Sequence, residues 1–136
     1  RLLAIDYGKK RTGIAVTDPA QIVPGGLTTV ATPTLIDFLR QYMAKETVDK
    51  VVVGWPMQTN GQPSENQARV GAFIGRLQKM CPDLPIIKWD ERYTSTMAHR
   101  TMLDAGLGRK RRQDKALVDE ISATIILQSY MDANMP

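Results

Sequence analysis

The sequence predicts an α/β domain with a five-stranded mixed sheet that helices cover on both faces. Two observations predict this class. Three strand-like segments follow one another at the start of the chain, and two further strand-like segments then alternate with helical ones. The chain has 136 residues, the length of one domain, so we expect residues 1–136 to form a single unit with its own core.

The first three strands are predicted from short apolar or β-branched runs. Residues 2–5 are all apolar, and a basic turn separates them from residues 12–17, so these two segments are typical of a hairpin. Residues 25–31 are rich in threonine and valine and form the third expected strand. Together the three segments indicate an antiparallel meander.

Helices and strands alternate after this meander. Pro33 is tolerated in a first helical turn, and apolar residues recur at helical spacing from there to Tyr42. Residues 49–55 are β-branched and typical of a parallel strand buried on both faces. The remaining expected elements are a helix over 63–80, a strand over 85–91, a helix from Thr94 or Ser95 to Gly106 or Gly108, a basic loop over 109–112 and a helix over 115–130.

The strand ends are where chemistry is expected. In sheets with right-handed strand-helix-strand crossovers, sites collect beyond the carboxyl ends of the strands, where the strand order reverses. The first strand ends at Asp6, the fourth at Trp55, and the fifth at Asp90 and Glu91. Candidate functional residues should therefore lie at these positions.

Three acids extend faces that are otherwise apolar or small. Asp6 alternates with Leu2 and Ala4, Glu91 extends the apolar face of the fifth strand, and Asp119 lies on the apolar stripe of the last helix. Glu120 is one residue out of that stripe, so we expect it to face solvent. Asp6, Glu91 and Asp119 are thus the candidate catalytic and metal-binding residues.

An inward carboxylate needs a partner, because an unpaired buried charge is costly. Two carboxylates about 4 Å apart repel by roughly 4 kcal/mol at an effective dielectric of 20, and a divalent cation reverses this into attraction. Oxygen ligands favour Mg²⁺ or Mn²⁺, as one ion or two. A plainer alternative stays open, in which each acid caps a loop or pairs with a neighbouring base.

Basic residues stand beside each of the three acids. The chain carries 18 basic against 14 acidic residues, a net charge of +4, which favours a polyanionic partner. Cations around an acidic metal site suit phosphodiester hydrolysis by a metal-activated water. The residues expected to contact nucleic-acid phosphates are Lys10, Arg11, Arg92, Arg109, Lys110, Arg111, Arg112 and Lys115.

Several other classes are disfavoured. The longest apolar runs fall far short of the roughly 20 residues that a membrane span needs, and no signal segment opens the chain, so we expect a cytoplasmic protein without a membrane partner. Cys81 is the single cysteine and can form no internal disulfide. His99 has the pattern of a helix-surface residue and is assigned no role.

Four motifs in order resemble the YqgF family of ribonuclease H-like proteins, described as Holliday-junction-resolvase-like and as pre-16S rRNA nucleases. The resemblance covers essentially the whole chain. The motifs are LAIDYG at 3–8 with KRTGIA at 10–15, VVGWP at 52–56 with NG at 60–61, DERYTS at 90–95, and Lys115 with VD at 118–119 and SA at 122–123.

The resemblance implies a ribonuclease H-like fold and carries the family's metal-binding acids to Asp6, Glu91 and Asp119. It further implies a structured RNA partner, the precursor ribosomal RNA of the small subunit, whose 5′ end is matured in the cytoplasm. Ala116 stands where junction resolvases of this fold carry a fourth acid, which counts against a resolvase and against a second metal ion. Gln58 and Tyr93 also depart from the usual residues, so loop contacts to substrate can differ.

Three alternatives remain open at this point. A branched-DNA endonuclease would act as a symmetric homodimer, whereas an RNA nuclease can be a monomer or a homodimer. A non-enzymatic RNA-binding ribosome-assembly factor would use the basic residues but not the inward acids. An actin-like ATPase or sugar kinase shares the start at Asp6, but it needs two such domains.

Overall fold

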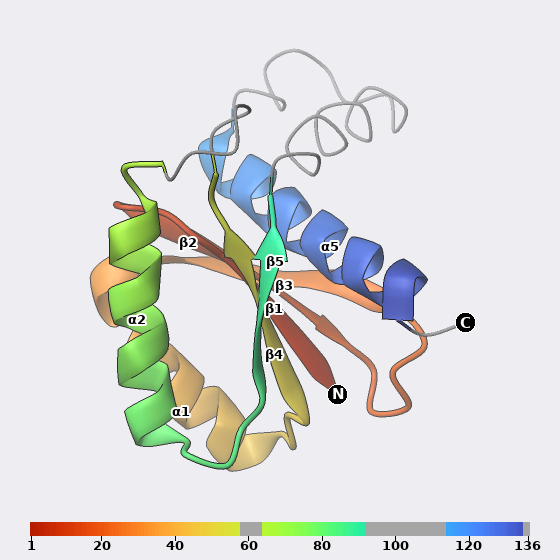
Figure 1. The fold of residues 1–136 in the computed structure, drawn as a ribbon. Coiled ribbons are helices and arrows are strands. Elements are labelled where there is room, and N and C mark those ends of the chain that lie inside the picture. The colour runs from red at the N-terminus through yellow and green to blue at the C-terminus, as the bar shows by residue number, and fades with distance from the viewer. Residues whose placement is uncertain (58–63, 92–113, 135–136) are drawn as a thin grey trace.

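The computed structural model describes residues 1–57, 64–91 and 114–134. Five strands form one sheet in the order β3-β2-β1-β4-β5 (Figure 1). Strands β1 to β3 pair antiparallel, and β4 and β5 run parallel to β1, which confirms the predicted mixed sheet. The strands are β1 (Leu2–Tyr7), β2 (Arg11–Thr17), β3 (Pro24–Ala31), β4 (Lys50–Trp55) and β5 (Ile86–Asp90).

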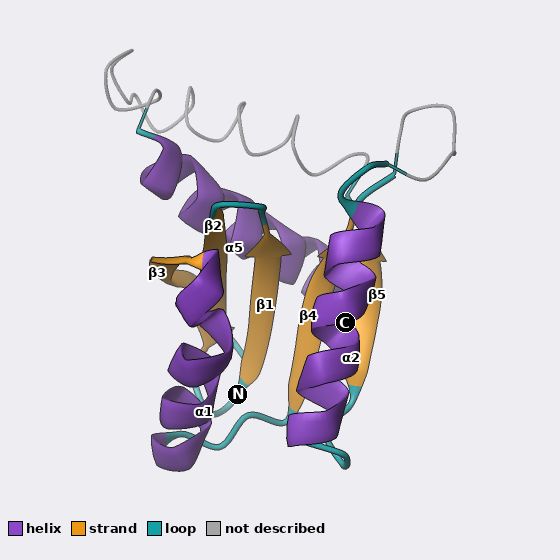
Figure 2. Cartoon of the chain, turned by 90° about the vertical axis from the view of Figure 1, so that its left-hand side faces the viewer, coloured by secondary structure: helices purple, strands orange, loops and turns teal. Residues whose placement is uncertain are grey.

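Helices cover both faces of this sheet, as predicted. Helices α1 (Leu35–Lys45) and α2 (Gln67–Met80) stand on one face, with the short 3₁₀ helix η1 (Thr32–Thr34) leading into α1. Helix α5 (Lys115–Asn134) crosses the other face, and Figure 2 shows it behind the strands. No helix within these described stretches is both long and apolar enough to cross a membrane.

Each face of the sheet has its own core, and the alternation along β1 divides the residues between them. Leu3 and Ile5 pack with Phe73 under α1 and α2, whereas Leu2 and Ala4 pack against α5. The α5 core also contains Ala15, Val52, Ala123, Ile126, Leu127, Tyr130 and Met131. Because side chains alternate along a strand, the residue after Ile5, Asp6, is directed to the α5 side.

Two helix ends differ from the sequence-based expectation. Helix α2 begins at Gln67, and the side chains of Ser64 and Gln67 donate to the Pro56 carbonyl at 3.3 and 3.2 Å, which ties this segment to the residue after β4. Helix α5 continues past residue 130 to Asn134, whose side chain donates to the Tyr130 carbonyl at 2.9 Å. The helix expected from Thr94 and the loop over 109–112 lie outside the described residues.

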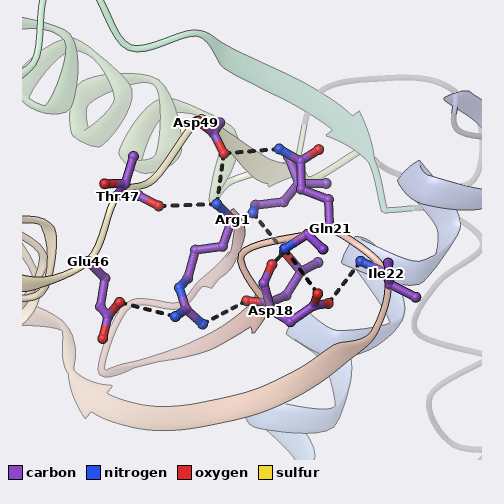
Figure 3. A network of polar contacts seen from close by, with 10 residues as sticks. Arg1, Asp18, Gln21, Ile22, Glu46, Thr47 and Asp49 are labelled. Atoms are coloured by element: carbon purple, nitrogen blue, oxygen red, sulfur yellow. Dashed lines mark hydrogen bonds and ion pairs between the residues drawn. The ribbon is translucent and has the colours of Figure 1, made fainter.

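A polar network fixes the sheet edge opposite the strand ends of interest (Figure 3). In the β2–β3 turn Asp18 accepts backbone N–H groups, that of Val23 at 2.7 Å among them, and these hydrogen bonds lower the pKa of Asp18. Gln21, at a φ of 60°, donates to Asp49 at 3.0 Å before β4. The Arg1 guanidinium bonds the Thr17 carbonyl at 3.0 Å, so the start of β1 and the end of β2 are held in register.

Candidate functional site

The carboxyl ends of β1, β4 and β5 and the first turn of α5 meet at one edge of the sheet (Figure 1). Asp6 is the second-to-last residue of β1, and Asp119 lies near the start of α5. Glu91 directly follows β5, and its N–H donates to the Trp55 carbonyl at 3.1 Å, which anchors it to the end of β4. Three elements distant in sequence thus bring the three predicted acids to the same end of the sheet.

Asp6 and Glu91 are hydrogen-bonded to each other through their carboxyl groups, which requires one of them to be protonated. Burial, first of all, and then the hydrogen bond with Asp6 and the charges of Asp6 and Asp90 together raise the pKa of Glu91 to about 9. Burial also raises the pKa of Asp6, although the hydrogen bond from Glu91 opposes this. With the pKa of Glu91 near 9, the pair of carboxyl groups holds a proton at neutral pH.

Asp119 completes the acidic group but has a partner of its own. Its charge raises the pKa of Asp6, so the two carboxyls lie within electrostatic range. Burial raises the pKa of Asp119, and Arg11, whose Nε donates to Oδ2 at 3.0 Å, lowers it. In the described part of the chain no three acidic, histidine or cysteine side chains are grouped tightly enough to hold a metal ion. In this state Arg11 is the partner of Asp119.

Two glycines allow this close approach. Gly13 pairs with Asp6 across β1 and β2, and a Cβ at Gly13 would collide with the backbone carbonyl oxygen of Asp119. A Cβ at Gly54 in β4 would collide with the carboxyl group of Glu91. Because neither position carries a side chain, α5 and Glu91 can lie directly on the sheet beside Asp6.

Gly13→Ala should destabilise the protein by roughly 1–3 kcal/mol, because the methyl group pushes the first turn of α5 off the sheet. Gly75→Ala is the matched control. A Cβ there meets nothing within 4 Å, so inside α2 it should be neutral or stabilise by up to about 1 kcal/mol. Urea unfolding of both variants measures the difference, and an equal loss of stability in the two would contradict the close contact.

Three of the predicted phosphate-binding residues belong to the described part of the chain, and they lie around this edge. Lys10 is exposed in the turn between β1 and β2, and Lys115 is exposed at the start of α5, where its charge lowers the pKa of Asp119. Arg11 is partly exposed beside them and is occupied by Asp119. The other predicted phosphate contacts, Arg92, Arg109, Lys110, Arg111 and Arg112, lie outside the described residues.

Glu120 does not face solvent as expected. It is partly buried, and its side chain covers Gly26 of β3, where a Cβ would collide with the carboxyl group. The edge strand β3 lies under α5, so a position beside the apolar stripe still packs on the sheet. The absence of a side chain at Gly26 makes the room for Glu120.

Two contacts at the site were not predicted from the sequence: the ion pair of Arg11 with Asp119 and the hydrogen bond of Asn66 to Tyr7. Arg11 alternates with Gly13 and Ala15 along β2, so the strand pattern could have placed it on the α5 side beside Asp119. Asn66 donates from Nδ2 to the Tyr7 carbonyl at 2.9 Å, which ties the start of α2 to the end of β1. No local pattern indicates this second contact, because it joins segments far apart in the chain.

This chain is similar to known proteins over nearly its whole length. A family model described as Holliday junction resolvase matches residues 1–133. A protein of Phocaeicola vulgatus named "Putative pre-16S rRNA nuclease" is 58% identical over 133 residues, which are 98% of this chain and 96% of that protein. A protein of Flavobacterium johnsoniae with the same name is 56% identical over 133 residues, with the same shares covered.

A solved structure shares the fold. The Holliday junction resolvase of fowlpox virus aligns with a TM-score of 0.54 at 13% sequence identity, covering 97% of each chain. At this identity the match speaks to the fold alone. Together with the strand order and the placement of the helices, it confirms the predicted ribonuclease H-like architecture.

Proposed function

The chain belongs to the Holliday junction resolvase family, a family of nucleases, and from this premise we propose that it is a metal-dependent endonuclease that matures the 5′ end of 16S ribosomal RNA in the cytoplasm. The observation that carries the proposal is the pair of mutually hydrogen-bonded carboxyls, Asp6 and Glu91, at the strand ends. The substrate class rests on the names of relatives that match over nearly their whole length.

The donor set fits a hard divalent cation such as Mg²⁺ or Mn²⁺. Asp6, Glu91 and Asp119 offer carboxylate oxygens, which these ions prefer over nitrogen and sulfur ligands. When bound, the cation would supply activation of a water molecule and polarisation of the scissile phosphodiester. Because the pKa of Glu91 is raised, its binding to a cation would release a proton.

Different residues of this chain would bind the cation and the substrate phosphates. Asp6 and Glu91 would hold the cation on the sheet, and Asp119 would be the ligand from α5, in exchange for its present ion pair with Arg11. The Arg11 guanidinium would then bind a substrate phosphate beside Lys10 and Lys115. Arg92 and the basic residues 109–112 extend this phosphate contact in our proposal because they adjoin Glu91 and α5 in sequence.

The structure also favours an enzyme over a binding module. Burial raises the pKa of Asp6, Glu91 and Asp119, and this costs folding free energy at pH values above their ordinary pKa values. A protein that merely bound RNA would gain nothing from this arrangement. A site that needs a cation accounts for it.

Cleavage of two labelled substrates, side by side, tests the proposal. One is a precursor fragment spanning the 5′ end of 16S ribosomal RNA, and the other is a four-way DNA junction, each incubated with Mn²⁺ or with EDTA. We expect the RNA alone to be cut, and to be cut with Mn²⁺ but not with EDTA. Cutting of the junction alone would identify a resolvase, and cutting of neither would favour the RNA-binding module.

A further inference from the structure

A second concave site lies on the face of the sheet opposite Asp6. This cavity, which we term the α1–α2 pocket, has a volume of about 450 Å³ and is lined by the end of β1, the start of α1 and the middle of α2. Its volume is in the range of roughly 300–1,000 Å³ typical of small-ligand sites. The residues that matter for its chemistry are Tyr7, Lys9, Ile36, Asp37, Phe73 and Arg76.

The inner wall of the pocket is apolar and aromatic. The rings of Tyr7 and Phe73 stack with centroids 5.1 Å apart and an interplanar angle of 27°. Phe73 is fully buried, whereas Tyr7 and Ile36 are partly exposed. A rigid aromatic wall backed by a second ring suits a flat apolar ligand such as a nucleobase.

The rim of the pocket is cationic. Lys9 and Arg76 are both exposed, and within residues 1–57, 64–91 and 114–134 neither forms an ion pair. Asp37 also lines the pocket, but its carboxylate is paired with Arg40 at 2.8 Å, which offsets its charge. The rim therefore favours an anionic group such as a phosphate.

The pocket and the acidic site share one edge of the sheet. Asp6 and Tyr7 are consecutive in β1, so their side chains lie on opposite faces at the same strand end. Figure 2 shows α1 and α2 on the near face of the sheet, on either side of β1, with α5 behind the sheet. A polynucleotide bound at Asp6 can thus pass over the edge and reach the pocket.

We propose that the α1–α2 pocket binds an unpaired nucleotide of the substrate strand beside the cleavage site. The base lies against Tyr7 and Ile36, and Lys9 and Arg76 bind its phosphate. This inference rests on the proposed function, because it assigns the pocket to the nuclease substrate. It predicts that the protein prefers a strand with unpaired nucleotides over a continuous duplex.

Equilibrium binding of the full chain to a fluorescein-labelled oligouridylate, in EDTA to prevent cleavage, tests this subsite. Arg76→Ala should weaken binding several-fold and reduce the salt dependence by the slope of one phosphate contact, about 0.7 in log Kd against log salt. Lys79→Ala is the matched control, because Lys79 is exposed on the same helix but does not line the pocket. It should leave both quantities unchanged.

Two further probes separate the parts of the proposal. A blunt RNA duplex should bind the wild-type chain and Arg76→Ala equally, and an abasic oligonucleotide should bind the wild type more weakly than oligouridylate does. Equal effects of Arg76→Ala and Lys79→Ala on oligouridylate would overturn the subsite. Because no probe is cleaved, a selective effect of Arg76→Ala would support the subsite even if the rRNA fragment were not cut. An oligothymidylate arm shows whether the pocket distinguishes RNA from DNA.

Discussion

Asp6→Asn should reduce cleavage by about a thousandfold or more while the protein stays folded. The substitution keeps the shape of the side chain but removes the charge at the centre of the acidic group. A bound cation contributes several kcal/mol to the stabilisation of a phosphodiester transition state, and about 1.4 kcal/mol corresponds to a tenfold change in rate. The loss of one principal ligand should forfeit most of this contribution.

Single-turnover cleavage of the substrate that the wild-type chain cuts measures this loss, with circular dichroism as the check on folding. Asp83→Asn is the matched control, because Asp83 is an exposed acid in the loop between α2 and β5, at the opposite edge of the sheet. It should cut at the wild-type rate. Retention of activity in Asp6→Asn would remove the acidic group from the mechanism and leave the basic residues as the functional surface.

The sequence was enough to predict which face of its own strand or helix each candidate acid lies on, because the spacing of apolar residues within one element indicates that face. Alternation along β1 placed Asp6 with Leu2 and Ala4, and helical spacing placed Asp119 with Ala123, and all of these partners lie in the α5 core. Such patterns depend on one element at a time and on the contrast between apolar and polar positions. They indicate which apolar residues lie on the same face of an element as a given side chain. The order of the strands in the sheet then determines which of these faces come together.

The features that could not be predicted depend on pairs of elements. The Arg11–Asp119 ion pair joins β2 to α5, and the position of Glu120 depends on the missing side chain at Gly26. The hydrogen bond from Gln67 to the Pro56 carbonyl joins the start of α2 to the residue after β4. Each contact spans a separation in the chain that no local periodicity encodes, so the register of neighbouring elements had to be known first.

Glu91 should make the metal-free protein less stable as pH rises. Its pKa is raised from the ordinary 4.5 to about 9 in the folded state, so between these values the folded chain holds a proton that the unfolded chain has lost. Stability is therefore full below pH 4.5 and falls as the pH rises toward 9. The slope is up to about 1.4 kcal/mol per pH unit for one such group.

Glu91→Gln should remove most of this slope, because the amide carries no titratable proton and can still donate a hydrogen bond to Asp6. Urea unfolding in EDTA from pH 5 to pH 9 measures it. Glu65→Gln, an exposed glutamate before α2, should keep the wild-type dependence. Identical pH dependence in Glu91→Gln and the wild type would show that the carboxyl pair does not hold the proton.

The same measurement in Mn²⁺ links the proton to the proposed cation. A cation that replaces the proton between Asp6 and Glu91 binds the folded chain alone, and at a hundredfold excess over its Kd it should add about 2.7 kcal/mol of stability. The gain in stability should grow from pH 6 to pH 8. As the pH approaches the raised pKa of Glu91, the cation competes with a lower proton concentration for the same carboxyl group. In Glu91→Gln the gain should be small at both pH values, since the site has lost a carboxylate ligand. A Mn²⁺ effect that is independent of both pH and Glu91 would place the ion elsewhere on the protein.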